Sequence, residues 1–189
     1  MQTEIIDVSQ FRQDSTFYPR IDLLLTVKSF DLQAIRKRYL ASKNNTSGKT
    51  GSVERRKPGL GGVVSCQINE GKLTAQRVLA KLKEPRGIAK SESCVGIAAE
   101  DTVYLLENGS TRKIESPWFS YIHSLDFSPH KPHRILISSS GLDCIFEFDT
   151  QTLQKTYEWF AWENGFNSAT DPKTNNSFFL TRNPIEADK

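Results

Sequence analysis

The sequence is poor in the residue types that build reactive centres. It has 3 histidines, 3 cysteines and 1 methionine among 189 residues. Cys66, Cys94 and Cys144 lie in separate apolar stretches, without the short paired spacings of zinc or redox motifs. We therefore expect these cysteines to be small buried hydrophobic residues, and we predict no metal site. The sequence identifies no cofactor.

Long apolar runs and a strong charge of one sign are also missing. No stretch is long enough to span a bilayer, and the N-terminal MQTEIIDVSQFRQD lacks a basic segment followed by an apolar one. We therefore expect a cytoplasmic protein that does not associate with membranes. The 25 basic and 22 acidic residues give a net charge of +3, which is too even a balance for a nucleic-acid footprint over the whole surface, so we do not expect nucleic acid as a partner.

Helix signals are almost absent, whereas strand signals recur along the chain. Short runs rich in Val, Ile, Leu, Phe and Tyr alternate with clusters of Gly, Pro, Asn, Asp and Ser, a pattern typical of strands and turns. The sequence therefore predicts an all-β fold, and the strand spacing of about ten residues suits sandwiches, barrels and propellers. The predicted strands are 23–29, 62–68, 73–79, 87–90, 94–99, 102–107, 111–115, 122–127, 134–139, 144–149, 157–160, 166–170 and 177–181.

Internal similarity favours the propeller. Residues 85–115 can be laid over residues 122–159 as two copies of the same series of strands and turns, with partial copies on either side. A repeat of about 40 residues with four strands is what one propeller blade needs. We therefore predict a β-propeller with about three recognisable four-stranded blades, belonging to an incomplete propeller of about six or seven. A sandwich of about twelve strands is the alternative fold.

Motifs in these copies resemble known propeller families. PRGIA and VYLLENGSTRKI, then IHSLDF and RILISSSGLDCIFEFDTQT, resemble the NHL-repeat and gluconolactonase-like propellers. The segment SSSGLDCIFEFD followed by YEWFAW is also similar to blades of arylsulfotransferase-like propellers. The resemblance covers about residues 23–180, and it implies a fold far more than it implies a function.

The same copies outline the domain organisation. We predict an N-terminal extension over residues 1–20 and a partial propeller over residues 21–189, interrupted by a basic loop at about 31–60. The copies give three strands of one blade, two complete blades and two strands of another, so this chain cannot close a propeller alone, and we expect it to belong to a longer polypeptide. The basic loop either meets an anionic partner or is simply solvated. Its Gly48-Lys49-Thr50 lacks the preceding glycine of a phosphate-binding loop.

Candidate ligand residues come from superposing the innermost strands of the copies. Arg86, His123 and Asn167 fall at equivalent positions near the starts of these strands, so adjacent blades would direct them toward one axis. We predict Arg86, Asn167, Tyr121 and Trp162 as ligand-binding residues and His123 as a catalytic candidate. A cation, an imidazole and an amide suit a small anionic or carbonyl-bearing ligand. The metal site of gluconolactonase-like propellers would need an oxygen ligand where Arg86 stands.

Two functions fit these observations. The first is a binding or scaffold propeller that presents a ligand or protein site at the mouth of its central channel. The second is an enzyme, either a lactonase-like hydrolase or an arylsulfotransferase-like transferase, that uses Arg86, His123 and Asn167. His123 also has a purely structural interpretation as a strand histidine satisfied by a backbone carbonyl. The sequence favours the binding module because it contains no compelling catalytic set.

Overall fold

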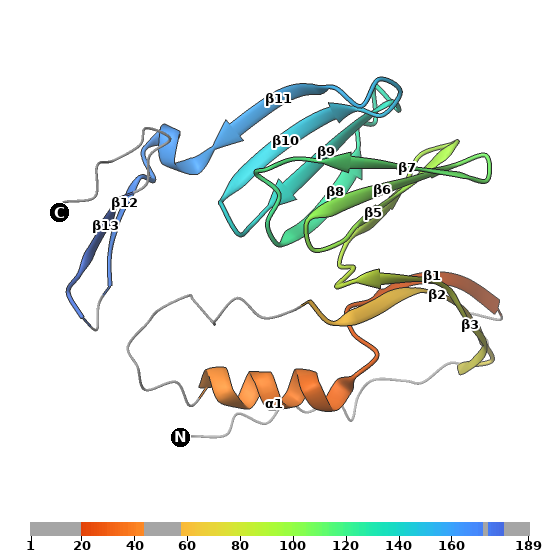
Figure 1. Ribbon diagram of the computed structural model, residues 1–189. Helices are drawn as coiled ribbons and strands as arrows, with labels where there is room; N and C mark the ends of the chain where they lie inside the picture. The colour runs from red at the N-terminus through yellow and green to blue at the C-terminus, as the bar shows by residue number, and fades with distance from the viewer. Residues whose placement is uncertain (1–19, 44–57, 172–173, 180–189) are drawn as a thin grey trace, which may run out of the picture.

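The computed structural model describes residues 20–43, 58–171 and 174–179, and within them thirteen strands form four antiparallel sheets (Figure 1). The first sheet has three strands and the next two have four strands each, followed by a two-stranded pair. The strands are β1 (Arg20–Val27), β2 (Leu60–Asn69), β3 (Lys72–Lys83), β4 (Ile88–Lys90), β5 (Cys94–Ala98), β6 (Thr102–Glu107), β7 (Ser110–Glu115), β8 (Ile122–Phe127), β9 (Arg134–Ser139), β10 (Cys144–Asp149), β11 (Lys155–Phe160), β12 (Ser168–Thr170) and β13 (Ser177–Phe179).

The order of strands within the sheets is that of propeller blades. In both four-stranded sheets, β4–β7 and β8–β11, each strand pairs with the next one along the chain. Each sheet is therefore completed before the next begins, and the described residues contain none of the Greek-key crossings that would define a sandwich. The all-β prediction and its series of three, four, four and two strands are confirmed.

The largest core lies between the sheets β4–β7 and β8–β11, which face each other in Figure 1. The two sheets pack closely, because a Cβ added at Gly96 of β5 would lie 2.8 Å from the side-chain atom Cδ1 of Ile135 in β9. The edge strands β4 and β8 are also neighbours, since a Cβ at Gly87 would lie 3.2 Å from Cα of Ser124. The core includes Val103, Leu105, Ile114, Ile122, Ile135, Ile137, Phe146 and Phe160, each at most 2% exposed.

The basic insertion differs from the predicted loop because it begins with a helix, α1 (Leu32–Lys43). The Asp31 carboxylate accepts a hydrogen bond from the Ala34 backbone N–H at 2.9 Å, which caps the helix, and Leu, Ala, Lys and Arg are good helix formers. In Figure 1 the helix lies on the far side of the first sheet from the two four-stranded sheets. Among the described residues, no helical segment has the length and hydrophobicity of a membrane span. Residues 48–50 lie outside the described residues.

The cysteines are buried and free, as the sequence predicts. Burial raises the pKa of the Cys94 thiol, and the Glu107 carboxylate adds to this effect. A raised pKa leaves little thiolate, so Cys94 acts as a small hydrophobic side chain in the core.

Candidate functional site

Three connections between strands meet at one end of the sheet β8–β11. Ser140, in the turn between β9 and β10, donates a hydrogen bond from Oγ to the Tyr121 carbonyl at 2.8 Å, and Tyr121 belongs to the connection from β7 to β8. The Ala161 N–H, in the connection from β11 to β12, donates to the Asp143 carbonyl at 3.0 Å. These bonds fix the three connections against one another, so their side chains form one continuous surface.

Arg86, the residue predicted to meet an anionic ligand, is paired inside the protein. Its Nη2 donates to Glu84 Oε2 at 3.0 Å and to Glu100 Oε2 at 2.9 Å. The side chains of Arg86, Glu84 and Glu100 are only 10%, 1% and 16% exposed. Charges withdrawn from water in this way depend on each other, because loss of one leaves the others desolvated and uncompensated.

Two further side chains complete this group. The guanidinium of Arg86 lies 4.8 Å from the centre of the Tyr121 ring, within cation–π range, and Lys28 Nζ lies 3.9 Å from Glu84 Oε2. We call Lys28, Glu84, Arg86, Glu100 and Tyr121 the Arg86 cluster. It contains two cations and two carboxylates, so its formal charges balance.

The Arg86 cluster also joins sheets. Thr26 of β1 donates from Oγ1 to the Arg86 carbonyl at 2.7 Å, and the Gly59 N–H, just before β2, donates to Glu84 Oε1 at 3.1 Å. Glu84 and Tyr121 both have left-handed backbones, with φ of 40° and 51°. Such residues cost about 1–3 kcal/mol each and persist only where their surroundings hold them. The Arg86 cluster therefore holds the first three sheets together.

His123 and Asn167 do not belong to the Arg86 cluster. His123 is exposed in β8, at the point where the pairing of β8 with β9 shifts register between Ile122 and Ser124. Asn167 is half-buried and directly precedes β12. No hydrogen bond or ion pair joins either side chain to Arg86 among the residues that the structure describes. Of the predicted set, Arg86 and Tyr121 are in direct contact, and convergence of the others on one ligand stays a prediction.

Trp162, also predicted to bind the ligand, belongs to the aromatic part of the core. It lies in a 3₁₀ turn (Ala161–Asn164), is 8% exposed, and its ring centre is 4.7 Å from that of Phe160 and 5.9 Å from that of Trp118. Its buried Nε1 has no hydrogen-bond partner in the described part of the chain. A contact of this indole with a ligand remains a prediction.

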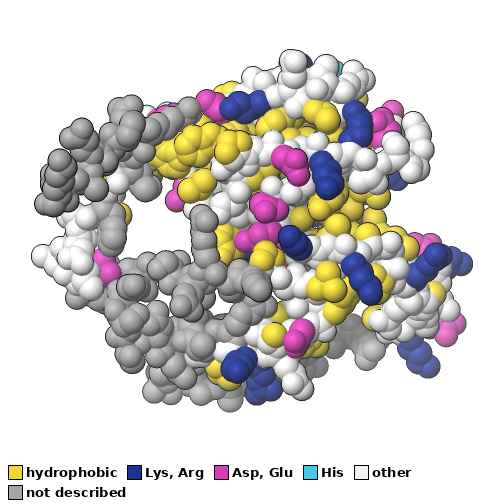
Figure 2. All heavy atoms as spheres, in the orientation of Figure 1, with side chains coloured by type: hydrophobic (Ala, Val, Ile, Leu, Met, Phe, Trp, Pro, Cys, Tyr) yellow, Lys and Arg dark blue, Asp and Glu magenta, His cyan; other side chains and the backbone are white. Residues whose placement is uncertain are grey.

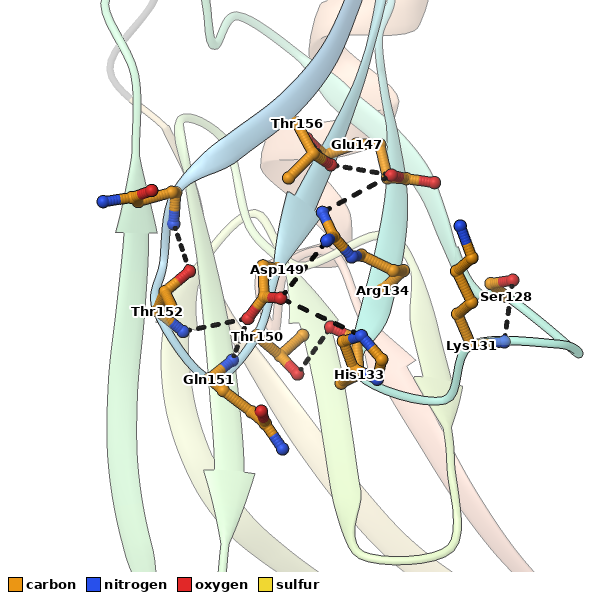
Figure 3. Close-up of polar contacts among 11 residues, drawn as sticks. Ser128, Lys131, His133, Arg134, Glu147, Asp149, Thr150, Gln151, Thr152 and Thr156 are labelled. Carbon is orange, nitrogen blue, oxygen red and sulfur yellow. Dashed lines mark hydrogen bonds and ion pairs between the residues drawn. The ribbon is translucent and has the colours of Figure 1, made fainter.

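The opposite end of the same sheet carries a polar network that sequence reasoning missed (Figure 3). Asp149 Oδ1 accepts hydrogen bonds from the backbone N–H groups of Gln151 at 2.8 Å and Thr152 at 2.9 Å, closing the turn after β10. Its Oδ2 lies 3.5 Å from Arg134 Nη2 and 3.9 Å from His133 Nε2. The Thr152 N–H, with help from Gln151 and Arg134, lowers the pKa of Asp149. This network holds turns in place. The sequence feature that could have predicted it is an Asp followed by short polar residues at the end of a strand.

An open cavity of about 420 Å³ lies at the end where the three connections meet. Ser138 and Ser140 line one side, Asp143 lies at the turn, and Ile145 with Trp159 forms an apolar wall. Figure 2 shows hydrophobic side chains gathered at the surface over β10 and the end of β11. Sequence reasoning did not reveal this cavity. No group of three His, Cys, Asp or Glu side chains in the described ranges is placed to hold a metal ion.

Comparisons with known proteins give distant structural similarity only. No family model matches the sequence, and no curated protein matches it. A chain from a crystal structure of a nidogen/laminin complex is similar over 53% of this chain and 39% of its own length, with 13% identity and a TM-score of 0.44. Hydrazine synthase from Kuenenia stuttgartiensis is similar over 59% of this chain and 39% of its own, with 13% identity and a TM-score of 0.40. The propeller assignment therefore depends on the order of strands in the sheets themselves.

Proposed function

We propose that this chain is a propeller-type binding module that presents the connections at one end of the sheet β8–β11 to a ligand or a partner protein. The observation that carries the proposal is the open cavity of about 420 Å³ at the place where three connections meet. Binding sites are concave and mostly apolar, with a few polar groups that orient the ligand. The strands of the sheet supply the fixed support that a surface made of connections needs. The proposal keeps the cytoplasmic location expected from the sequence.

The alternative is the lactonase-like or arylsulfotransferase-like enzyme suggested by the sequence resemblance, with Arg86, His123 and Asn167 as its site. The pairing of Arg86 argues against it. An anionic substrate would have to compete with Glu84 and Glu100 for the guanidinium, and it would take this cation away from the buried Glu84 carboxylate. The binding module needs no such rearrangement, because its surface is open and does not include the Arg86 guanidinium.

Amide NMR of the isotopically labelled chain tests the proposal. Sodium sulfate, sodium acetate, δ-valerolactone and n-butylammonium chloride are titrated separately as probes of the possible ligand chemistries. We expect saturable shifts at amides 138–143 and 161–167, on the proposed surface, with at least one probe. Shifts confined to the starts of β4 and β8, around Arg86 and His123, would overturn the binding surface and favour the enzyme.

A further inference from the structure

The cavity at the end of the sheet β8–β11 carries a negative charge. Among the described residues that line it, Asp143 is the charged one, and none is Lys, Arg or His. We propose that this cavity binds an organic cation, an alkylammonium or alkylguanidinium group with an apolar stem. The proposal rests on the binding function above and names the ligand class of that same surface.

The negative charge is available to a ligand. The Asp143 side chain is exposed, and its carboxylate makes no hydrogen bond or ion pair with any residue of the described ranges. Its backbone is nonetheless fixed, because the Asp143 carbonyl accepts the Ala161 N–H at 3.0 Å and the residue has a left-handed φ of 48°. A carboxylate with a fixed backbone and no ion pair can attract a cation, because no existing ion pair has to break first.

The walls of the cavity suit the rest of such a ligand. Ser138, Ile145 and Trp159 are direct cross-strand neighbours on β9, β10 and β11, so they form one row across the sheet. Trp159 is half-buried, and Phe166 beyond it is 69% exposed. Aromatic faces attract ammonium and guanidinium groups and also pack well against a methylene chain.

Hydroxyl groups complete the recognition of an N–H donor. Ser140 Oγ uses its hydrogen to reach the Tyr121 carbonyl at 2.8 Å, so its lone pairs remain as acceptors. An ammonium or guanidinium group carries only donors. The cavity thus offers a carboxylate, an acceptor hydroxyl and an aromatic wall, which an anion or a purely apolar ligand would not use together.

The test is a titration with n-butylguanidinium chloride, followed by NMR at the Trp159 indole N–H, with sodium sulfate as the anionic comparison. Asp143→Asn removes the charge but keeps the shape, and Asn tolerates the left-handed backbone. Asp101→Asn is the matched control, because Asp101 is an exposed residue in the equivalent turn of the sheet β4–β7. We expect the dissociation constant to rise about two- to fivefold in Asp143→Asn, the range for an exposed ion pair, and to stay unchanged in Asp101→Asn.

Equal affinity of the wild-type chain and Asp143→Asn, or no saturable shift at Trp159, would overturn the cation proposal. Shifts at residues 138–143 produced by sulfate alone would overturn it while leaving the binding surface intact. Shifts confined to the surroundings of His123 would instead overturn the binding surface. An arginine-containing tripeptide amide and spermidine separate the two sources of the cation, because the tighter of the two shows whether a protein side chain or a free amine is preferred.

Discussion

The Arg86 guanidinium donates a hydrogen bond to the Glu100 carboxylate at 2.9 Å, linking the start of β4 to the turn between β5 and β6. Arg86, which the sequence predicts to bind a ligand, therefore makes a structural ion pair inside the protein. Superposing strand starts selected Arg86 by its position along the chain, and it could not show which carboxylates the fold brings against it. The pair therefore provides the first test of the structural account.

Replacing Arg86 by Met should lower the free energy of unfolding by about 3–5 kcal/mol, because it removes the guanidinium that the Glu84 and Glu100 carboxylates share inside the protein. Urea denaturation measures this change. Arg112→Met is the matched control, since the ion pair of Arg112 with Glu107 is about one-third exposed and should contribute about 0–1 kcal/mol. Equal losses of unfolding free energy in the two variants would show that the Arg86 cluster does not hold the sheets together.

The close approach of the two four-stranded sheets gives a second prediction. Gly96→Ala places a methyl group 2.8 Å from Cδ1 of Ile135 and should destabilise the protein by about 1–3 kcal/mol. Ile135→Val removes that Cδ1 atom, so the double variant should recover part of the loss. Strictly additive free energies in the double-mutant cycle would contradict the packing of β5 on β9.

Trp162 distinguishes core packing from ligand contact. Trp162→Ala should cost about 3–5 kcal/mol through the cavity that it leaves. Trp162→Phe keeps an aromatic ring and removes an N–H that is buried without a partner in the described residues, so its cost should stay below about 1.5 kcal/mol. Thermal melting compares the two variants. A Phe variant as unstable as the Ala variant would show that the indole N–H makes an essential bond.

The turn at Asp149 predicts a pH dependence of stability. The lowered pKa of this carboxyl in the folded chain means that its ionised form stabilises the protein above the unfolded value of about 3.9, and that this contribution is lost as the pH falls through the folded value. Asp149→Asn keeps an acceptor oxygen but does not titrate. The stability difference between wild type and variant should be full at pH 6 and shrink below pH 4. A difference independent of pH would contradict the account.

Much of the β-structure follows from the sequence alone. The bounds of β6, β8, β9 and β10 agree with prediction to the residue, because short apolar runs between polar turns leave little freedom in where a strand begins and ends. The helix α1 was missed because the apolar pattern of its residues is weak, so its cap at Asp31 was the main local signal.

The candidate site was less predictable, since it depends on contacts between distant parts of the chain. Arg86 and Glu100 are 14 residues apart, and only folding shows that their charges cancel. The cavity beside Asp143 and Trp159 likewise forms from a turn and a strand that the sequence pattern describes separately. Local propensity identifies each element, but charge balance and concavity are properties of the assembled surface.

The central claim, that the chain binds rather than catalyses through Arg86, His123 and Asn167, is tested most directly by turnover. Hydrolysis of δ-valerolactone and sulfate transfer from 4-nitrophenyl sulfate to phenol are measured for the wild-type chain and for His123→Ala. His123 is exposed, so the substitution should change stability by less than about 0.5 kcal/mol. We predict that both proteins show only the background rate of buffer. Turnover in the wild-type chain that disappears in an equally stable His123→Ala variant would contradict the account.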